Sequence, residues 1–321
     1  MALTKHGVGR RTGWRPSYGD RIFWVITMLI ALGVIGLMFG MCYEMWQQSA
    51  LSRAAFGWSF FWTTAWDPVA EEFGALPYIF GTVVTSLVAL AMAGPIGIGI
   101  AIFLVELAPE KLRSPVGFLV EMLASIPSVV YGLWGLFVMV PWIGSTLGPG
   151  LSHTLGFLPI FKGPSFGVSM LSASLILTVM VIPTVAAVAR DVLQAVPNHQ
   201  REAMLAMGAT KWEMVWHAVL PYGRAGIIGG VMLGLGRAFG ETMAVTMVIG
   251  NQPSIHTSIL QPGHTMAAVI ANEFTEATYD LYLHALIEIG LVLFLVSFVL
   301  NLLARLLVWQ VSRGPAGAIR A

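Results

Sequence analysis

Long apolar runs separated by short polar segments set the pattern of this sequence. A bilayer core about 30 Å thick needs about 20 apolar residues in each helix that crosses it. Six runs meet this requirement, and they predict an all-α fold with six membrane-spanning helices. The predicted spans are residues 22–43, 78–104, 117–140, 166–189, 224–249 and 283–307.

The lengths of two uncharged runs affect how they are interpreted. The run 122–161 is too long for one helix, and we expect its prolines and glycines to divide it into one span and a loop poor in polar residues. These breakers are Pro141, Gly144, Gly148, Pro149 and Gly150. The first run, 22–43, exceeds the apolar core of a signal peptide, and no clear cleavage site follows it, so we expect it to be retained as a membrane helix.

Composition supports this interpretation. Of 321 residues, 57% are hydrophobic and only 10% are charged, whereas an average soluble domain has about 25% charged residues. So few charges cannot cover a globular surface in water. The chain is therefore expected to be an integral membrane protein in contact with the lipid bilayer.

The positions of the cations predict the orientation, because Lys and Arg are enriched in cytoplasmic loops. They gather in the N-terminal tail, in the loops 105–116 and 190–223, and after the last span. The alternate loops carry mainly acids, namely Glu44, Asp67, Glu71, Glu72, Glu273, Glu276 and Asp280. Both termini are therefore predicted to be cytoplasmic.

The external loop 44–77 is rich in aromatic residues. They are Trp46, Phe56, Trp58, Phe60, Phe61, Trp62, Trp66 and Phe73. Amphipathic rings prefer the membrane interface, and we favour that location. A docking surface for an external partner is the alternative.

The stretch Gly226 to Val245 combines a membrane-helix core with two charges, Arg237 and Glu241. With Gly230 and Gly234, these residues share one face of a helix, and the charged pair has i,i+4 spacing. One interpretation is a buried pair that fixes helix packing, with the glycines permitting close approach. The other is a substrate pathway in which Arg237 binds an anion, because a guanidinium keeps its charge and offers several fixed donors.

Other polar residues in the spans are weaker candidates for lining a pore. A break at Pro127 would free backbone groups near Glu121, Ser125 and Ser128, which could then line a cavity. For Glu121 the alternative is a carboxylate that reaches the membrane surface.

Three more polar residues of the spans have plain structural explanations. Thr85 and Ser86 could contact a passing anion, although hydrogen bonds to backbone carbonyls are the simpler expectation. Glu288, in the last span, is expected to lie at the external interface.

The cytoplasmic loop 190–223 is too polar to span and too patterned to be a linker. Asn198 is expected to cap a short helix that Gly208 ends. Thr210 and Glu213 form a capping box that starts a second short helix, which Pro221 is expected to end. The loop is therefore predicted to project two short helices that dock on a partner.

This loop resembles the EAA loop of binding-protein-dependent ABC importer permeases, whose pattern is E-A-A-x3-G-x9-I-x-L-P. The matching residues are Glu202, Ala203, Gly208, Leu220 and Pro221. Met204 and Ala218 depart from the pattern, and both are apolar, so a docking helix is retained. The resemblance assigns coupling to a partner ATPase to Arg201, Glu202, Ala203, Gly208, Leu220 and Pro221.

Three further stretches resemble the C-type permease of the phosphate-specific (Pst) transporter. They are Trp66 to Pro68 with Phe73 to Pro77, then Ile126 to Gly132, and then Gly236 to Thr242. The resemblance extends from about residue 20 to about residue 310. It implies a six-helix type I ABC importer transmembrane domain with a cytoplasmic coupling loop.

The resemblance also implies the function and the partners. The chain would form half of the pore of an ATP-driven inorganic phosphate importer in the cell inner membrane, paired with a second homologous permease. A cytoplasmic ABC ATPase dimer would bind MgATP, and an external phosphate-binding protein would deliver the substrate. Arg237, Glu241, Gly234 and Gly230 would line the substrate pathway.

Catalysis in this chain is not expected. The sequence has no G-x4-G-K-[ST] phosphate loop, so any ATP must be bound by another chain. The histidines have no zinc-site spacing, and the single cysteine, Cys42, excludes an internal disulfide. We therefore expect no catalytic residue, no metal, no cofactor in this chain and no nucleic-acid partner.

The sequence is interpreted as one membrane domain with tails. The predicted division is a basic tail (1–21), a first helix with its aromatic external loop (22–77), the permease domain (78–307, with the coupling loop 190–223) and a second tail (308–321). The nearest alternative function is a permease for sulfate or molybdate. An ion-coupled secondary transporter is a further alternative, although no internal repeat supports it.

Overall fold

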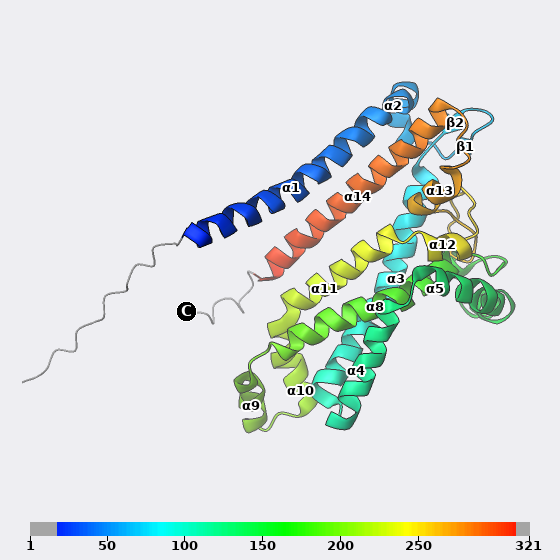
Figure 1. Ribbon diagram of the computed structural model, residues 1–321. Coiled ribbons are helices and arrows are strands. Elements are labelled where there is room, and N and C mark those ends of the chain that lie inside the picture. The colour runs from blue at the N-terminus through cyan, green and yellow to red at the C-terminus, as the bar shows by residue number, and fades with distance from the viewer. Residues whose placement is uncertain (1–17, 313–321) are drawn as a thin grey trace, which may run out of the picture. The chain divides into compact units, whose positions relative to one another are not determined.

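The computed structural model describes residues 18–312, which are mostly helical (Figure 1). Predictions that concern residues 1–17 and 313–321, including several cytoplasmic cations, lie outside the described residues. The chain divides into two units after Gln47. In the first unit, helix α1 (Tyr18–Gln48) is apolar on all sides, as expected of a membrane helix.

The longer helices of the second unit are α3 (Leu76–Ile102), α4 (Glu110–Ser125), α8 (Met170–Gln194), α11 (Leu220–Gly240) and α14 (Asp280–Ser312). The shorter ones are α2 (Ala50–Phe56), α5 (Ser128–Trp134), α6 (Val140–Trp142), α7 (Gly148–Leu155), α9 (Asn198–Ala206), α10 (Lys211–Met214), α12 (Met243–Val248) and α13 (Met266–Glu273). Single turns complete the set, with 3₁₀ turns η1 (Gly57–Phe61) and η5 (Pro159–Phe161) and π turns η2 (Phe103–Leu107), η3 (Gly135–Met139), η4 (Ile143–Leu147) and η6 (Val215–Val219). Two short strands of two residues each, β1 (Trp66–Asp67) and β2 (Glu72–Phe73), pair in an antiparallel arrangement.

Six helices in the described part of the chain are long and apolar enough to cross a membrane, which confirms the predicted number. They are Tyr18–Gln48, Leu76–Leu107, Ser128–Leu155, Met170–Gln194, Lys211–Gly240 and Asp280–Gln310. The chain is a multi-pass membrane protein. Four spans agree with the predicted ranges, whereas the third and the fifth require correction.

The third span does not run over 117–140. The backbone is extended at Ile126 and Pro127, so α4 ends at Ser125 and a new helix begins at Ser128. That helix continues to Leu155, so the prediction that Pro141 and the following glycines end it is also wrong. The π turn η3 comes just before Pro141, and its shifted hydrogen bonds accommodate a residue that has no N–H to donate.

The fifth span begins earlier and ends earlier than predicted. Helix runs without interruption from Lys211 to Gly240, so Pro221 does not end it. The π turn η6 again precedes the proline. At the other end, Glu241 adopts an extended conformation, which separates α11 from α12.

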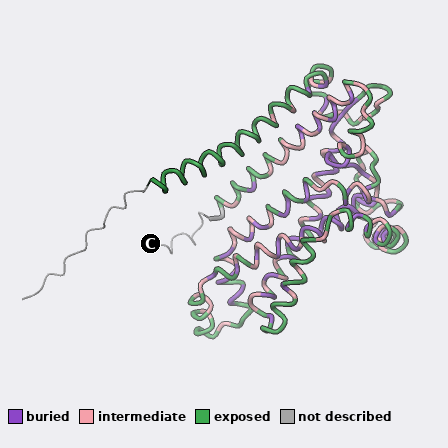
Figure 2. The backbone as a smooth tube through the Cα atoms, in the orientation of Figure 1, coloured by how far each residue is buried: buried purple, intermediate pink, exposed green. Residues whose placement is uncertain are grey.

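Helices α3, α8 and α11 form the core of the second unit (Figures 1 and 2). Small residues permit their close approach: a Cβ placed on Gly97 of α3 would lie 2.9 Å from the Cβ of Val185 on α8. Along α11, the added Cβ atoms of Gly230 and Gly234 would lie 2.9 and 2.8 Å from valine atoms of α8. The glycine face of α11 therefore packs against α8.

The aromatic external loop is largely part of a second core rather than a set of interfacial rings. Phe60 and Phe73 are fully buried, and they pack with Tyr78 and with Tyr282 of α14. The ring N–H of Trp66 donates a 2.7 Å hydrogen bond to Glu273. Trp46, Trp58 and Trp62 stay exposed, so the interfacial interpretation is retained for these rings only.

Candidate functional site

The loop 190–223 forms two short helices joined by a sharp corner. α9 ends at Ala206, and Gly208 adopts a left-handed conformation with φ of 86°, which confirms Gly208 as the stop signal. The predicted capping box of Thr210 and Glu213 is also confirmed, because each residue hydrogen-bonds the backbone N–H of the other. The loop therefore folds as an ordered corner.

Asn198 does not cap α9 as predicted. The helix already includes Asn198, and Pro197 occupies the capping position without a side-chain hydrogen bond. The side-chain oxygen of Asn198 accepts a 3.3 Å hydrogen bond from Arg201 instead.

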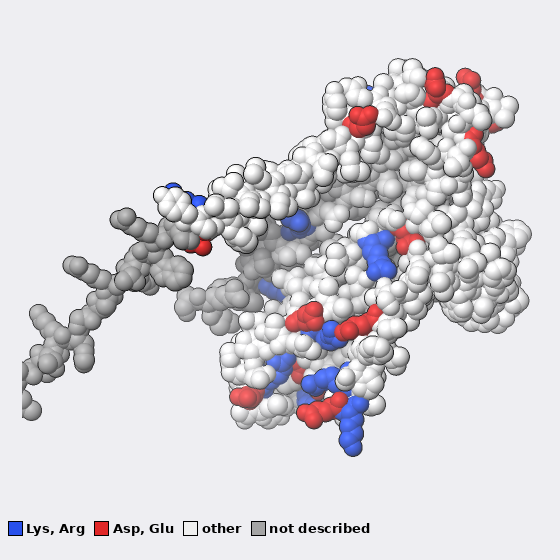
Figure 3. All heavy atoms as spheres, viewed as in Figure 1, with Lys and Arg blue, Asp and Glu red and all other residues white. Residues whose placement is uncertain are grey.

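The outer side of this corner is exposed and partly apolar. Glu202, Ala203 and Gly208 are exposed, as residues that dock on another protein must be. Leu205 and Met207 add exposed apolar surface, with Met207 78% accessible. By contrast, Leu220 and Pro221 lie inside the continuous helix and are half-buried. Charged side chains surround α9, α10 and the start of α4, as Figure 3 shows.

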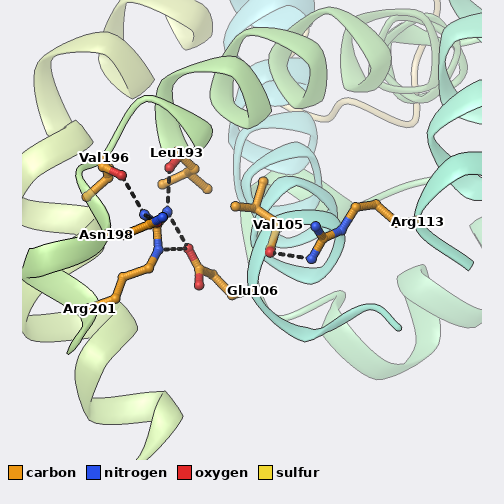
Figure 4. A network of polar contacts seen from close by, with 7 residues as sticks. All are labelled: Val105, Glu106, Arg113, Leu193, Val196, Asn198 and Arg201. Atoms are coloured by element: carbon orange, nitrogen blue, oxygen red, sulfur yellow. Dashed lines mark hydrogen bonds and ion pairs between the residues drawn. The ribbon is translucent and has the colours of Figure 1, made fainter. Parts of the chain in front are cut away.

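Arg201 differs from the rest of the predicted docking set because it points inward (Figure 4). Its side chain is 15% exposed, and it forms an ion pair with Glu106, which is 6% exposed. Nε and Nη2 donate to the same Glu106 oxygen at 3.0 and 2.9 Å. Sequence reasoning missed Glu106, which lies 95 residues earlier in the π turn η2 and has no local signal.

Arg237 lies in the last turn of α11, where its side chain is exposed. Its Nη1 donates a long hydrogen bond of 3.4 Å to the hydroxyl of Thr184 on α8. Glu241 turns to the next helix, where its Oε1 accepts a 3.3 Å hydrogen bond from the N–H of Ala244.

The expectation of an i,i+4 ion pair is therefore wrong, because α11 ends at Gly240, between Arg237 and Glu241. The ion pairs found in the described residues do not include this one. The packing interpretation applies to Gly230 and Gly234, which α8 covers, whereas Arg237 stays accessible beside the helix break.

The polar residues near Pro127 make different contacts. Glu121 pairs with Arg190 of α8 through a 2.8 Å contact between Oε1 and Nη1, which sequence reasoning did not find. Ser125 donates to the carbonyl of Met122, and Ser128 begins α5 in a half-buried position. The break at Ile126 and Pro127 interrupts the span predicted over 117–140, and the pair Glu121–Arg190 ties α4 to α8.

The remaining polar residues of the spans are buried. Thr85 donates a 2.7 Å hydrogen bond to the carbonyl of Gly81, which confirms backbone bonding. Ser86 is buried without an assigned partner. Glu288 is 2% exposed and therefore lies inside the protein. The described residues contain no cluster of His, Cys, Asp or Glu that could hold a metal ion.

The fold is that of a transmembrane domain of type I ABC importers. A bacterial ABC transporter involved in import of the polysaccharide alginate aligns over 92% of this chain and 98% of its own, with a TM-score of 0.58 and 16% identity. An inward-facing MetNI methionine ABC transporter aligns over 73% of this chain and 94% of its own, with a TM-score of 0.53 and 19% identity. At these identities the likeness establishes the fold alone.

Sequence comparison identifies the family. A family model described as "Binding-protein-dependent transport system inner membrane component" matches residues 93–313. The phosphate transport system permease protein PstC of Mesorhizobium japonicum is 45% identical over 93% of this chain and 92% of its own. PstC of Pasteurella multocida is 47% identical over 90% and 88%. The chain therefore belongs to the binding-protein-dependent transport permeases, among the phosphate transport system permeases of the PstC type.

Proposed function

We propose that this chain is the membrane-spanning permease subunit of an ATP-driven importer of inorganic phosphate and that it forms half of the translocation pore. The observation that carries the proposal is the 45–47% identity to PstC permeases over nine-tenths of the chain. No fold-level likeness would discriminate phosphate from another substrate, because the aligned solved structures share only the fold.

Arg237 is the residue proposed to contact phosphate in the pathway. A guanidinium binds phosphate oxygens through charge-assisted hydrogen bonds and cannot lose its proton. In the described structure its partner is one distant hydroxyl, so most of its donors are free for an anion. Glu241 lies at the helix break, where a carboxylate can accept a hydrogen bond from a protonated phosphate or weaken phosphate binding and so favour release.

The energy source and partners follow from the same proposal. A second permease completes the pore, an external phosphate-binding protein delivers the anion, and an ABC ATPase dimer binds MgATP. The ATPase contacts the exposed side of α9 and the corner at Gly208. With this side cytoplasmic, both termini lie in the cytoplasm.

Purification and reconstitution test the proposal. The protein is extracted from the inner membrane in mild detergent, and we expect an ATPase and a second permease to co-purify. In vesicles with MgATP and the external binding protein, labelled phosphate should be taken up and sulfate should not. Sulfate uptake without phosphate uptake would assign another oxyanion, and uptake that needs an ion gradient but no ATP would overturn the ABC assignment.

A further inference from the structure

Arg201 uses nearly all of its donors within the chain. In addition to the two hydrogen bonds to Glu106, Nη2 donates to the carbonyl of Leu193 at 2.7 Å, and Nη1 contacts the carbonyl of Val196 (Figure 4). Glu106 belongs to the π turn that ends α3. Leu193 belongs to the last turn of α8, and Val196 follows that helix.

These contacts join three elements at one guanidinium. The last carbonyls of an α-helix have no partner within the helix, and Arg201 provides donors to those at the end of α8. Its planar fork also matches a carboxylate in a way that the single ammonium of lysine cannot. Because both charged side chains are nearly buried, loss of either leaves an uncompensated charge.

Apolar packing supports the same connection. Met204 of α9 packs against a buried cluster that includes Ala101 of α3 and Leu193 of α8. In the other direction along the chain, α9 is joined to α10 through Gly208, where a Cβ would meet no atom within 4 Å. Arg201 therefore attaches α9 to the ends of α3 and α8, while the apolar side of α9 also packs against the helix that follows the glycine corner, at Met214, Val215 and Val219.

We propose that Arg201 is a positioning residue that fixes α9 to the ends of α3 and α8, so that displacement of α9 moves these two core helices with it. The proposal rests on the proposed function, because it assumes that an ATPase displaces α9. It changes the role of Arg201, which the sequence placed among the residues that contact the ATPase.

The first test measures phosphate transported per ATP hydrolysed in vesicles that hold the complete complex. Arg201→Gln should still assemble with the ATPase and hydrolyse ATP, while the ratio falls by about tenfold, as expected when a buried pair is broken. Glu106→Gln should lower the ratio in the same way, and Arg201→Lys should recover part of it. Arg113→Gln is the matched control, because Arg113 donates to Val105 of the same π turn from α4.

The second test restores the connection by a covalent link. In a Cys42→Ala background, Glu106→Cys and Arg201→Cys together should uncouple transport from hydrolysis. A short bifunctional thiol reagent should then restore the ratio, whereas it should leave either single-cysteine variant uncoupled. A cross-linked protein that remains uncoupled or stops hydrolysing ATP would mean that α9 must move relative to α3, and it would overturn the inference.

The two proposals fail in different measurements. If wild-type vesicles take up no phosphate, the proposed function is wrong. If wild-type vesicles are coupled and both Arg201→Gln and Glu106→Gln remain equally coupled, only the positioning role is wrong. A variant that loses the ATPase on purification is judged by the cross-linking test, in which the restored link should recover assembly as well.

Discussion

Two arginines of this chain lie in opposite surroundings. Arg201 is nearly buried, and its guanidinium is shared between Glu106 and the end of α8. Arg237 is exposed beside a helix break, with a 3.4 Å contact to one hydroxyl. An arginine with its donors occupied holds parts of a protein together, whereas one with free donors can bind an anion. We therefore propose positioning for Arg201 and substrate contact for Arg237.

The sharpest test of this difference is Arg237→Gln. Loss of two charge-assisted hydrogen bonds to phosphate is worth about 3 kcal/mol, so we expect uptake to fall about 100-fold. Thermal stability and co-purification of the ATPase should stay at wild-type levels, because Arg237 holds no element in place. The measurement is labelled phosphate uptake in vesicles, with Arg237→Lys as the charge-retaining control. A complex that falls apart instead would assign Arg237 to packing.

Gly208→Val tests whether the corner beside Arg201 needs its backbone conformation. A β-branched residue at φ of 86° costs about 1–2 kcal/mol, which corresponds to about a tenfold loss of correctly formed loop. Phosphate-dependent ATP hydrolysis should fall by that factor, while membrane insertion is retained. Gly208→Asn is the matched control, since asparagine tolerates this conformation. Equal loss in both variants would point to the surface of Gly208 rather than its backbone.

Gly234→Leu tests the packing of the helix that carries Arg237. The new side chain would press on Val181 and Val185 of α8, and overpacking of this kind costs about 1–3 kcal/mol. We expect a lower midpoint of thermal unfolding of the purified protein. Gly229→Leu is the control on the same helix, because a Cβ there meets no atom within 4 Å. Unchanged stability in Gly234→Leu would mean that α8 and α11 separate easily.

The smallest effect is expected for the more exposed ion pair, Arg190–Glu121. Its side chains are 24% and 55% exposed, so water screens the pair, and a double-mutant cycle should give a coupling energy of about 0.5 kcal/mol. The same cycle on the buried pair Arg201–Glu106 should give several times more. Unfolding in denaturant measures both. Similar coupling energies for the two pairs would remove the distinction that we draw from burial.

Local signals in the sequence were sufficient for much of the fold. The number of spans, the stop at Gly208 and the capping box at Thr210 depend on residues close together in the chain, and all three are confirmed. The break at Glu241 was missed because hydropathy continues across it. The prolines at 141 and 221 were misinterpreted because π turns before them preserve the helix.

The candidate site was less accessible to sequence reasoning. Arg201 and Glu106 are separated by 95 residues, and neither has a local pattern that names the other. Solvent exposure also differs between residues that the sequence had placed in one group. In the docking loop, Arg201 is nearly buried whereas Glu202 is exposed. On the glycine-rich helix, Gly234 is buried whereas Arg237 is exposed.

The unbroken helix from Lys211 to Gly240 has a mechanical consequence. At 1.5 Å per residue, its 30 residues make a rod about 45 Å long, which begins beside the docking corner and carries Arg237 in its final turn. A tilt of about 5° at the corner would move the far end by about 4 Å, which exceeds the length of a hydrogen bond. A small rotation at the corner can therefore move the guanidinium of Arg237 far enough to make or break a hydrogen bond at the other end of the rod.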